Sequence, residues 1–362
     1  MPISAVDTIS LAFQHTKQQL GQPFRFWQWT RLALVGLLAG EMGSGGCNLP
    51  SNFHIPQSTG ESRHFLDPSF PSFDPALYAG LIAVLVVAAL VLGVIMLYVS
   101  SVMRFVLFDS VLAKECRIRR AWSRRQGAGA KYFFWQIGFA LAMIAALVIL
   151  LGIPAAIAFG LGWFKQPNEH VPGLVLGGIG LFLLLVVFGI AAAVVQVFTK
   201  DFVVPQMALE GIGPLEGWRR LWPMIQTEKG GYAGYVGMKI VLAIAAAVII
   251  GIASLILGLV VAIPTAVVAI VAMITGKTVG LTWNALTITI AVVAGCILLA
   301  GFLYLIALLS VPAIVFFPAY AMYFLAARYR ALHLVLYPPP PPPAFTGTPP
   351  GEPPPLLPEP IG

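Results

Sequence analysis

The chain has 362 residues, of which 59% are hydrophobic, whereas Asp, Glu, Lys and Arg together make up 10%. Soluble domains carry about 25% charged residues, so this composition excludes an ordinary soluble protein. Several uncharged runs exceed the ~20 residues that a helix needs to cross a ~30 Å hydrocarbon layer. We therefore expect an all-α integral membrane protein.

The formal net charge is +7, and its placement argues for membrane orientation rather than for nucleic-acid binding. The basic residues cluster in segments between apolar runs, as the positive-inside rule requires. The cysteines Cys47, Cys116 and Cys296 are dispersed and form no CxxC pair. Neither these thiols nor the histidines have ligand spacing, so no metal and no cofactor are predicted.

The N-terminal third predicts an amphipathic start, a short span and a loop. Residues 1–26 mix basic and aromatic residues, as expected of a cytoplasmic segment at the headgroup level. Residues 27–42 are apolar but short, so they either cross with tilt or bilayer thinning, or re-enter the same side. Residues 43–75 are rich in Gly, Ser, Asn and Pro, and we expect an extracytoplasmic loop. Glu41, beside this Gly-rich turn, is a candidate functional residue.

A lipoprotein signal is an alternative interpretation of this region. The stretch LALVGLLAGEMGSGGC ends at Cys47, a position suited to lipid modification. Ser44 stands where such a signal prefers an aliphatic residue, and tryptophans precede its core, so a membrane span is favoured.

Five stronger spans follow, in the uncharged residues 76–103, 132–164, 171–199, 240–276 and 278–327. The last two runs have 37 and 50 residues, more than one straight helix needs to cross the bilayer. We expect these two runs to kink or end early at Pro264, Pro312 and Pro318, because proline removes a backbone donor.

The loop charges predict the orientation of the spans. Residues 113–131 hold seven Lys and Arg and residues 200–239 hold five, whereas the alternate loops hold one each, at Arg63, Lys165 and Lys277. This alternation predicts six crossings within a transmembrane domain at residues 27–337, with both termini in the cytoplasm. If the first span does not cross, only the N-terminus changes side.

Two of the boundaries look alike. FVLFDSVL at residues 105–112 and FVVPQMAL at residues 202–209 start 97 residues apart, and Trp122 and Trp218 follow them 96 residues apart. Each copy continues into glycines and an aromatic stretch. The pattern indicates two similar helix–elbow–helix hairpins in one orientation. Chance likeness between two apolar-to-basic boundaries is the alternative.

Residues 211–225, GIGPLEGWRRLWPMI, predict an interfacial amphipathic helix. Pro214 suits the first turn, and apolar and charged residues segregate to opposite faces. Arginines near an anionic leaflet contribute ~1 kcal/mol each. Simple anchoring and specific headgroup recognition both fit. The candidate lipid-headgroup contacts in the two elbows are Arg124, Arg125, Trp218, Arg219, Arg220 and Trp222.

Three motifs carry a family resemblance. FVVPQMALEGIGPLEGWRR at residues 202–220, the early FWQWTRLALVGL followed by GSGGCN, and the late FFPAYAMYF resemble an uncharacterised group of bacterial multi-pass proteins. They are similar, more distantly, to the membrane domain attached to some bacterial glycerophosphodiester phosphodiesterases. The resemblance covers about residues 20–335 and implies a bacterial cytoplasmic membrane. The chain has no room for the phosphodiesterase barrel, so that activity does not carry over.

The sequence offers no catalytic pattern. Ionisable groups inside spans mark functional sites, but the runs are uncharged, and Arg104, Asp109 and Lys239 stand at span ends, where snorkelling accounts for them. HExxH, Walker and GxSxG motifs are absent. We therefore expect no convergence of polar side chains at one depth, and no enzyme.

The expected function is that of a membrane accessory or scaffold protein contacting lipids, an envelope protein or a second copy of itself. The alternative is a permease-like carrier for a neutral or amphiphilic solute, which a polar-lined cavity reaching the bilayer centre would favour. Residues 338–362 begin with six consecutive prolines and predict a disordered cytoplasmic tail, either a stiff extension or a ligand for an SH3-like partner.

Overall fold

The computed structural model describes residues 4–21, 25–41, 75–163, 171–278 and 285–338, and these residues form helices and connections without a strand. The elements are α1 (Asp7–Gly21), α2 (Phe26–Leu38), α3 (Pro75–Leu112), α4 (Ile118–Gly160), α5 (Val171–Phe198), η1 (Thr199–Val203), α6 (Val204–Glu210), α7 (Pro214–Thr227), α8 (Lys229–Thr278), α9 (Ala285–Leu309), α10 (Val311–Ala326) and α11 (Arg330–Leu336). Apart from Pro75 and Pro338, the predicted loop 43–75 and the Pro-rich tail 338–362 lie outside the described residues, and so does Cys47.

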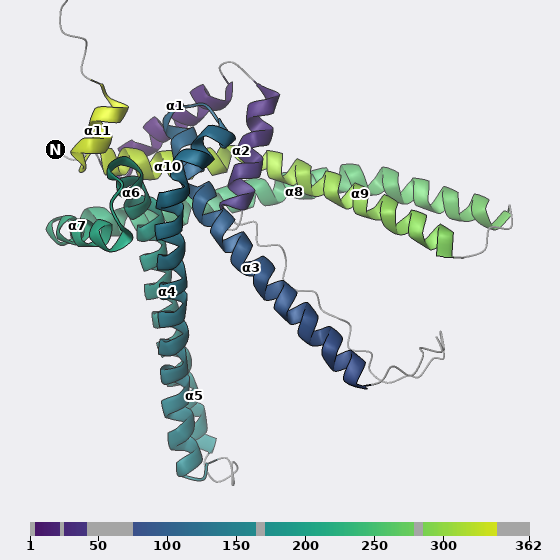
Figure 1. Cartoon of the computed structure of the whole chain (residues 1–362), viewed down its shortest axis with the longest axis horizontal. Coiled ribbons are helices and arrows are strands. Elements are labelled where there is room, and N and C mark those ends of the chain that lie inside the picture. The colour runs from purple at the N-terminus through teal and green to yellow at the C-terminus, as the bar shows by residue number, and fades with distance from the viewer. Residues whose placement is uncertain (1–3, 22–24, 42–74, 164–170, 279–284, 339–362) are drawn as a thin grey trace, which may run out of the picture.

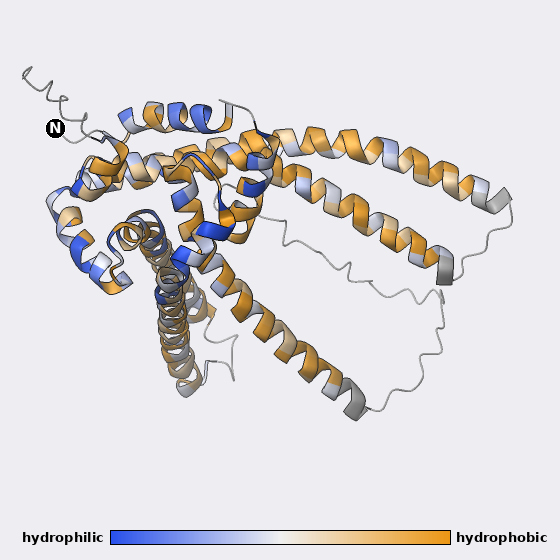
Figure 2. Ribbon diagram, turned by 45° about the horizontal axis from the view of Figure 1, so that its top comes forward, coloured by the Kyte–Doolittle hydropathy of each residue, from blue (hydrophilic) through white to orange (hydrophobic). Residues whose placement is uncertain are grey.

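Three apolar arms project from one helical body (Figure 1). One arm is α3, the second pairs α4 with α5, and the third pairs α8 with α9. Figure 2 shows that the arms are hydrophobic along their length. Five helical stretches are long and apolar enough to cross a membrane, namely Gly80–Leu112, Ile118–Gly160, Val171–Glu210, Lys229–Thr275 and Thr287–Ala326. The chain is thus all-helical in its described part, with five helices suited to lipid.

The short first span is α2, which has 13 residues and a length of about 20 Å. Its C-terminal end lies against α3, because Arg104 Nη2 donates a hydrogen bond of 3.1 Å to the Ala39 carbonyl. Arg104 lies about 44 Å along α3 from Pro75, at 1.5 Å per residue. The helix α2 therefore ends far from the point where α3 begins.

The prolines act differently in the two longest apolar runs. The expected break before Pro312 is confirmed, since α9 ends at Leu309 and Pro312 stands in the first turn of α10. We expected a kink or an early end at Pro264, and the early end is wrong, because α8 continues through Pro264 to Thr278. Proline removes only one backbone donor, a loss that long apolar helices tolerate.

The body has an aromatic core built from elements far apart in sequence. Tyr235 of α8 stacks on Tyr320 of α10 with ring centroids 5.1 Å apart, and Phe202 of η1 meets Tyr232 edge-on at 5.4 Å. Phe324 of α10 packs against Phe202, Tyr232 and Tyr235. These rings are buried, and together they fix η1 between α8 and α10.

Candidate functional site

A π-helical turn places two charged residues inside the body. The helix α5 runs into η1, where the wider turn inserts an extra residue into the helical register. Lys200 and Asp201 lie on this turn, and Asp201 is only 5% exposed. Such turns are often found at functional sites in helices.

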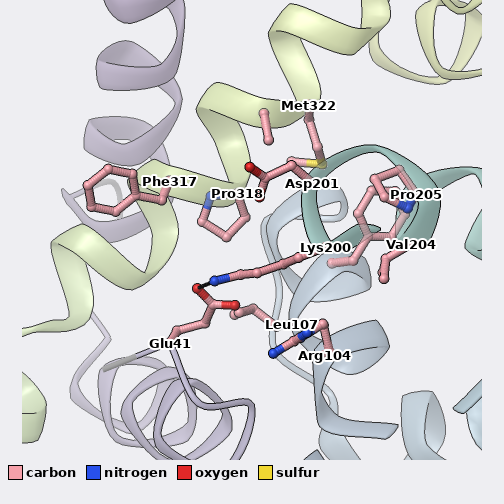
Figure 3. A pocket seen from close by; sticks show the side chains of 12 residues that line it. Glu41, Arg104, Leu107, Lys200, Asp201, Val204, Pro205, Phe317, Pro318 and Met322 are labelled. Atoms are coloured by element: carbon pink, nitrogen blue, oxygen red, sulfur yellow. Dashed lines mark hydrogen bonds and ion pairs between the residues drawn. The ribbon is translucent and has the colours of Figure 1, made fainter. Parts of the chain in front are cut away.

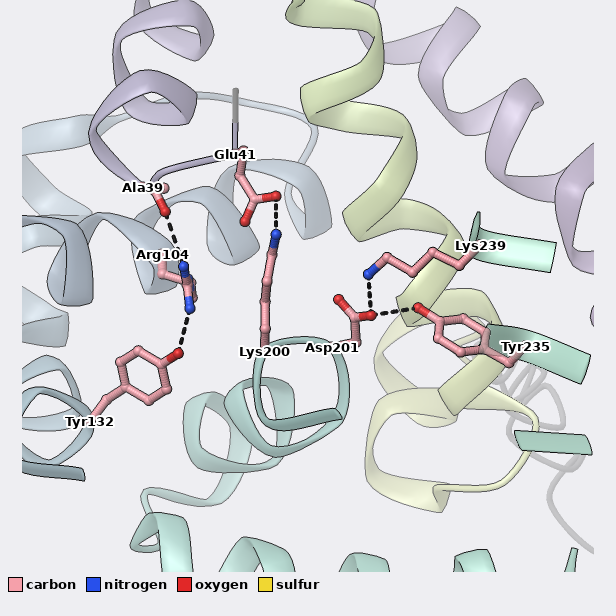
Figure 4. A network of polar contacts seen from close by, with 8 residues as sticks. All are labelled: Ala39, Glu41, Arg104, Tyr132, Lys200, Asp201, Tyr235 and Lys239. Atoms are coloured by element: carbon pink, nitrogen blue, oxygen red, sulfur yellow. Dashed lines mark hydrogen bonds and ion pairs between the residues drawn. The ribbon is translucent and has the colours of Figure 1, made fainter. Parts of the chain in front are cut away.

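Each of these residues forms an ion pair with a different part of the chain, Lys200 with Glu41 just after α2 and Asp201 with Lys239 of α8 (Figure 4). The Lys200 ammonium donates to the carboxylate of Glu41, whose side chain is 3% exposed. The Asp201 carboxylate accepts hydrogen bonds from the Lys239 ammonium and, at 2.8 Å, from the Tyr235 hydroxyl. Both pairs are shielded from solvent, so the removal of one partner leaves a buried charge unbalanced.

Arg104 completes this charge network. Its Nη1 donates to the Tyr132 hydroxyl, its Nη2 donates to the Ala39 carbonyl, and its guanidinium lies 5.4 Å from the centre of the Tyr132 ring. Among the described residues, its Nε is buried without a hydrogen-bond partner. Arg104 therefore donates its hydrogen bonds to neutral oxygens, whereas Lys200 and Lys239 donate to carboxylates.

A small cavity lies at the centre of the network (Figure 3). It measures about 30 Å³, and a space of 10–15 Å³ on this measure holds one water molecule. Its walls combine the charged groups Glu41, Arg104, Lys200 and Asp201 with apolar side chains of α3 and α10. The cavity admits one or two water-sized particles. Within the described segments, no three His, Cys, Asp or Glu side chains come together in a way that would hold a metal.

The expectation that Arg104, Asp109 and Lys239 merely extend from span ends is wrong. Arg104 and Lys239 join one buried network with Glu41, and Asp109 forms an internal ion pair. Polar side chains thus converge after all, because the ends of several spans meet in one body. One sequence signal pointed to this, since the 97-residue offset that aligns the two octets also aligns Arg104 with Asp201.

The first elbow holds an internal ion pair and an exposed arginine side by side. Arg125 donates from Nε to Asp109 Oδ2 at 2.8 Å and from Nη2 to Asp109 Oδ1 at 2.7 Å, and its Nη1 bonds the Ala208 carbonyl. The Arg125 side chain is 13% exposed, whereas that of Arg124 is 70% exposed. Arg125 thus joins α4 to α3 and α6, whereas the exposed Arg124 makes only a longer contact with the same carboxylate, 3.5 Å from Nη2 to Asp109 Oδ2.

In the second elbow, α7 begins at Pro214 as expected, and its apolar residues differ in burial although helical spacing places them on one side of the helix. Leu221 is fully buried, and Trp218 Nε1 donates to Thr199 Oγ1 at 3.1 Å. Trp222 is 56% exposed. Among the basic residues Arg219 is exposed, and Arg220 pairs with two glutamates, Glu210 and Glu216.

A basic groove opens beside the first elbow. It has a volume of about 550 Å³ and is lined by Asp109, Glu115, Arg117, Arg120 and Arg124, among others. Arg117 bonds Glu115, with 2.9 Å between Arg117 Nε and Glu115 Oε2, and Asp109 is held by Arg125. Arg120 and Arg124 therefore give the groove its excess positive charge.

Comparison with known proteins identifies the family. Residues 3–335 match the Family of unknown function (DUF7544). The chain belongs to this family. Neither a curated protein nor a solved structure matches it. Because the match covers the arms and the body alike, the charge network and the elbows both lie within the family region.

Proposed function

We propose that this DUF7544 protein is a non-enzymatic accessory or scaffold protein that holds anionic lipid headgroups against its basic elbows. The observation that carries the proposal is the groove of about 550 Å³ lined by Arg120 and Arg124 at the base of the apolar arms. The headgroup phosphate of a lipid in the groove would balance these cations, and the acyl chains of that lipid would lie along the exposed apolar surface of an arm.

The second elbow supports the same role. Arg219 is exposed on α7, and Trp222 is an exposed ring of the kind favoured at the headgroup level. The two elbows are neighbours, since Lys131 Nζ donates to the Gly211 carbonyl at 3.1 Å. Partners of the scaffold would include membrane lipids and an envelope protein or a second copy of the chain.

The small central cavity supports a non-enzymatic role. It holds one or two water-sized particles, and of its two basic lining residues Lys200 is ion-paired with Glu41. A substrate would need a larger space beside groups that can exchange protons with it.

We also propose how the chain crosses the membrane. We place six crossings in a bacterial cytoplasmic membrane with both termini inside, built around two similar hairpins and distantly related to the membrane domain attached to some glycerophosphodiester phosphodiesterases. The repeat is supported by matching contacts. Phe105 meets Tyr132 edge-on at 6.0 Å, and Phe202 meets Tyr232 edge-on at 5.4 Å.

Native mass spectrometry of the full chain in a neutral detergent tests the headgroup proposal. We expect phosphatidylglycerol to be retained in preference to phosphatidylcholine, and the Arg124→Gln/Arg219→Gln double variant to lose that preference. Lys17→Gln, at an exposed lysine of α1, is the matched control and should retain it. Equal retention of both lipids by the wild type would overturn the proposal.

A second candidate function is a carrier for an amphiphilic solute. It is favoured by an apolar recess of about 530 Å³ between α2, α8 and α9, lined by residues such as Trp29, Ile256 and Leu305. A stoichiometric solute that is not a phospholipid and copurifies with the chain would support this function over the scaffold. Substitution of Ile256 by Trp should then reduce its retention, because the larger ring fills the recess.

A further inference from the structure

Among the described residues, the charge network brings three cations, Arg104, Lys200 and Lys239, together with two carboxylates, Glu41 and Asp201. Lys200 is paired with Glu41, and Lys239 is paired with Asp201. Arg104 donates only to the neutral oxygens of Tyr132 and Ala39. In the part of the chain that the structure describes, no carboxylate forms an ion pair with Arg104, so its charge is left over.

The leftover charge lies at the cavity. Arg104 is one of the lining residues, and its Nε is a buried donor with no acceptor among the described residues. An unpaired charge and an unsatisfied buried donor each destabilise a folded protein. A small anion in the cavity would accept the Nε–H hydrogen bond and balance the guanidinium at the same time.

We propose that this cavity binds a monovalent anion of about the size of chloride, on Arg104 and close to Lys200. The volume of about 30 Å³ selects for size, since it holds one or two water-sized particles and is too small for a phosphate with its four oxygens. The apolar walls from Leu107, Phe317 and Pro318 lower the local dielectric, which strengthens the attraction between the anion and Arg104.

Thermal unfolding of the full chain in a neutral detergent tests the site. Sodium chloride is compared with sodium gluconate at equal ionic strength, because gluconate is too large for the cavity. We expect the unfolding temperature to rise with chloride to a plateau, as a ligand that binds the folded state requires. Arg104→Gln should remove this rise, and Lys17→Gln, a control at an exposed lysine of α1, should keep it.

Variants with the opposite charge change give a second, independent readout. Glu41→Gln and Asp201→Asn each remove a negative charge near the cavity. Each should therefore lower the chloride concentration at half-maximal effect by about tenfold. Tighter chloride binding is the opposite of what a general loss of folding would cause. These two variants therefore still test the proposal if Arg104→Gln does not fold.

Line broadening of the ³⁵Cl NMR signal by the wild-type protein, relieved by bromide, measures the site directly. The proposal is overturned by a chloride effect of equal size in Arg104→Gln and Lys17→Gln. It is also overturned if the half-maximal chloride concentration does not shift in Glu41→Gln and Asp201→Asn. A third contrary outcome is an unfolding temperature that is equal in chloride and gluconate, together with no broadening of the ³⁵Cl signal. The lipid selectivity of the elbows is measured in a separate experiment, so each proposal can fail while the other stands.

Discussion

Lys200 and Asp201 are adjacent in the sequence, yet they form ion pairs with opposite parts of the body, Lys200 with Glu41 after α2 and Asp201 with Lys239 in α8. The π turn η1 therefore connects the N-terminal region to the third arm through two successive side chains. The network thus adds ion pairs between elements that the apolar core also joins, since one buried cluster includes Leu32 of α2, Phe202 of η1 and Tyr235 of α8.

The ion pair between Asp201 and Lys239 should show strong energetic coupling. Asp201→Asn or Lys239→Met alone should lower the free energy of unfolding by about 3 kcal/mol, because each leaves a buried charge unpaired. The double variant should lose clearly less than the sum of the two losses. SDS titration monitored by tryptophan fluorescence measures all three variants, and simple additivity would contradict a direct pair.

Glycine is required where α4 crosses α3. A Cβ at Gly129 would lie 2.5 Å from Val102 Cγ2 and 3.0 Å from Val102 Cα, so the helices would have to separate. Gly129→Ala should destabilise the protein by about 1–3 kcal/mol. Gly127→Ala is the matched control on the same helix, where a Cβ meets nothing within 4 Å, and it should be neutral or stabilising by up to about 1 kcal/mol. Equal effects in the same SDS titration would rule out the close crossing.

The two neighbouring arginines of the first elbow should separate stability from lipid contact. Arg125→Ala should lower the free energy of unfolding by about 2–3 kcal/mol, since it leaves Asp109 and the Ala208 carbonyl without their partner. Arg124→Ala should change stability by less than about 0.5 kcal/mol, because its side chain is exposed. A large stability loss in Arg124→Ala would contradict this assignment.

Stability should fall in mild acid because of His15. Its Nε2–H donates to the Val111 carbonyl at 2.9 Å, so its Nδ1 accepts from the Tyr323 hydroxyl at 3.0 Å. Burial lowers the pKa of His15, and the nearby Lys114 lowers it further. The unfolded chain then binds a proton at higher pH than the folded chain, so stability is greatest above about pH 6.5 and decreases below it.

His15→Gln should flatten this part of the pH profile, whereas His333→Gln, at an exposed histidine, should leave it unchanged. Unfolding temperatures recorded from mildly alkaline to mildly acidic pH check both variants. A wild-type profile that rises as the pH falls through 6.5 would reverse the sign and contradict the neutral, buried state of His15.

The membrane orientation is checked by cysteine labelling in a background without native cysteines. We expect an impermeant maleimide to label Ser58→Cys in intact cells, and to label Arg119→Cys only after the membrane is opened. Labelling of Arg119→Cys from outside would reverse the predicted orientation. Protection of both sites would contradict the crossing predicted for residues 76–103, which separates the two positions.

The long spans were predictable because composition alone determines them, and all five stronger runs are matched by helices suited to lipid. The start of α7 at Pro214 was also predictable, since proline fixes a helical φ and needs no donor in the first turn. These features depend on local chemistry and on hydropathy over about 20 residues.

The charge network was not predictable in the same way. Glu41 and Lys200 are 159 residues apart, and each stands near the end of a different apolar run, where lipid headgroups explain a charge equally well. Only the packing of the span ends determines whether such a charge forms an internal ion pair or contacts lipid headgroups. The division of α7 into a buried Leu221 and an exposed Trp222 likewise depends on the position of η1, which no local pattern in α7 encodes.

The attachment of every arm at one end only has a mechanical consequence. With 28 residues, α5 is about 42 Å long, and the π turn η1 adjoins the end of α5 that is attached to the body. A rotation of about 10° there would swing the distal tip by about 7 Å, given that length. A slight rearrangement around Lys200 and Asp201 would thus be magnified at the opposite leaflet.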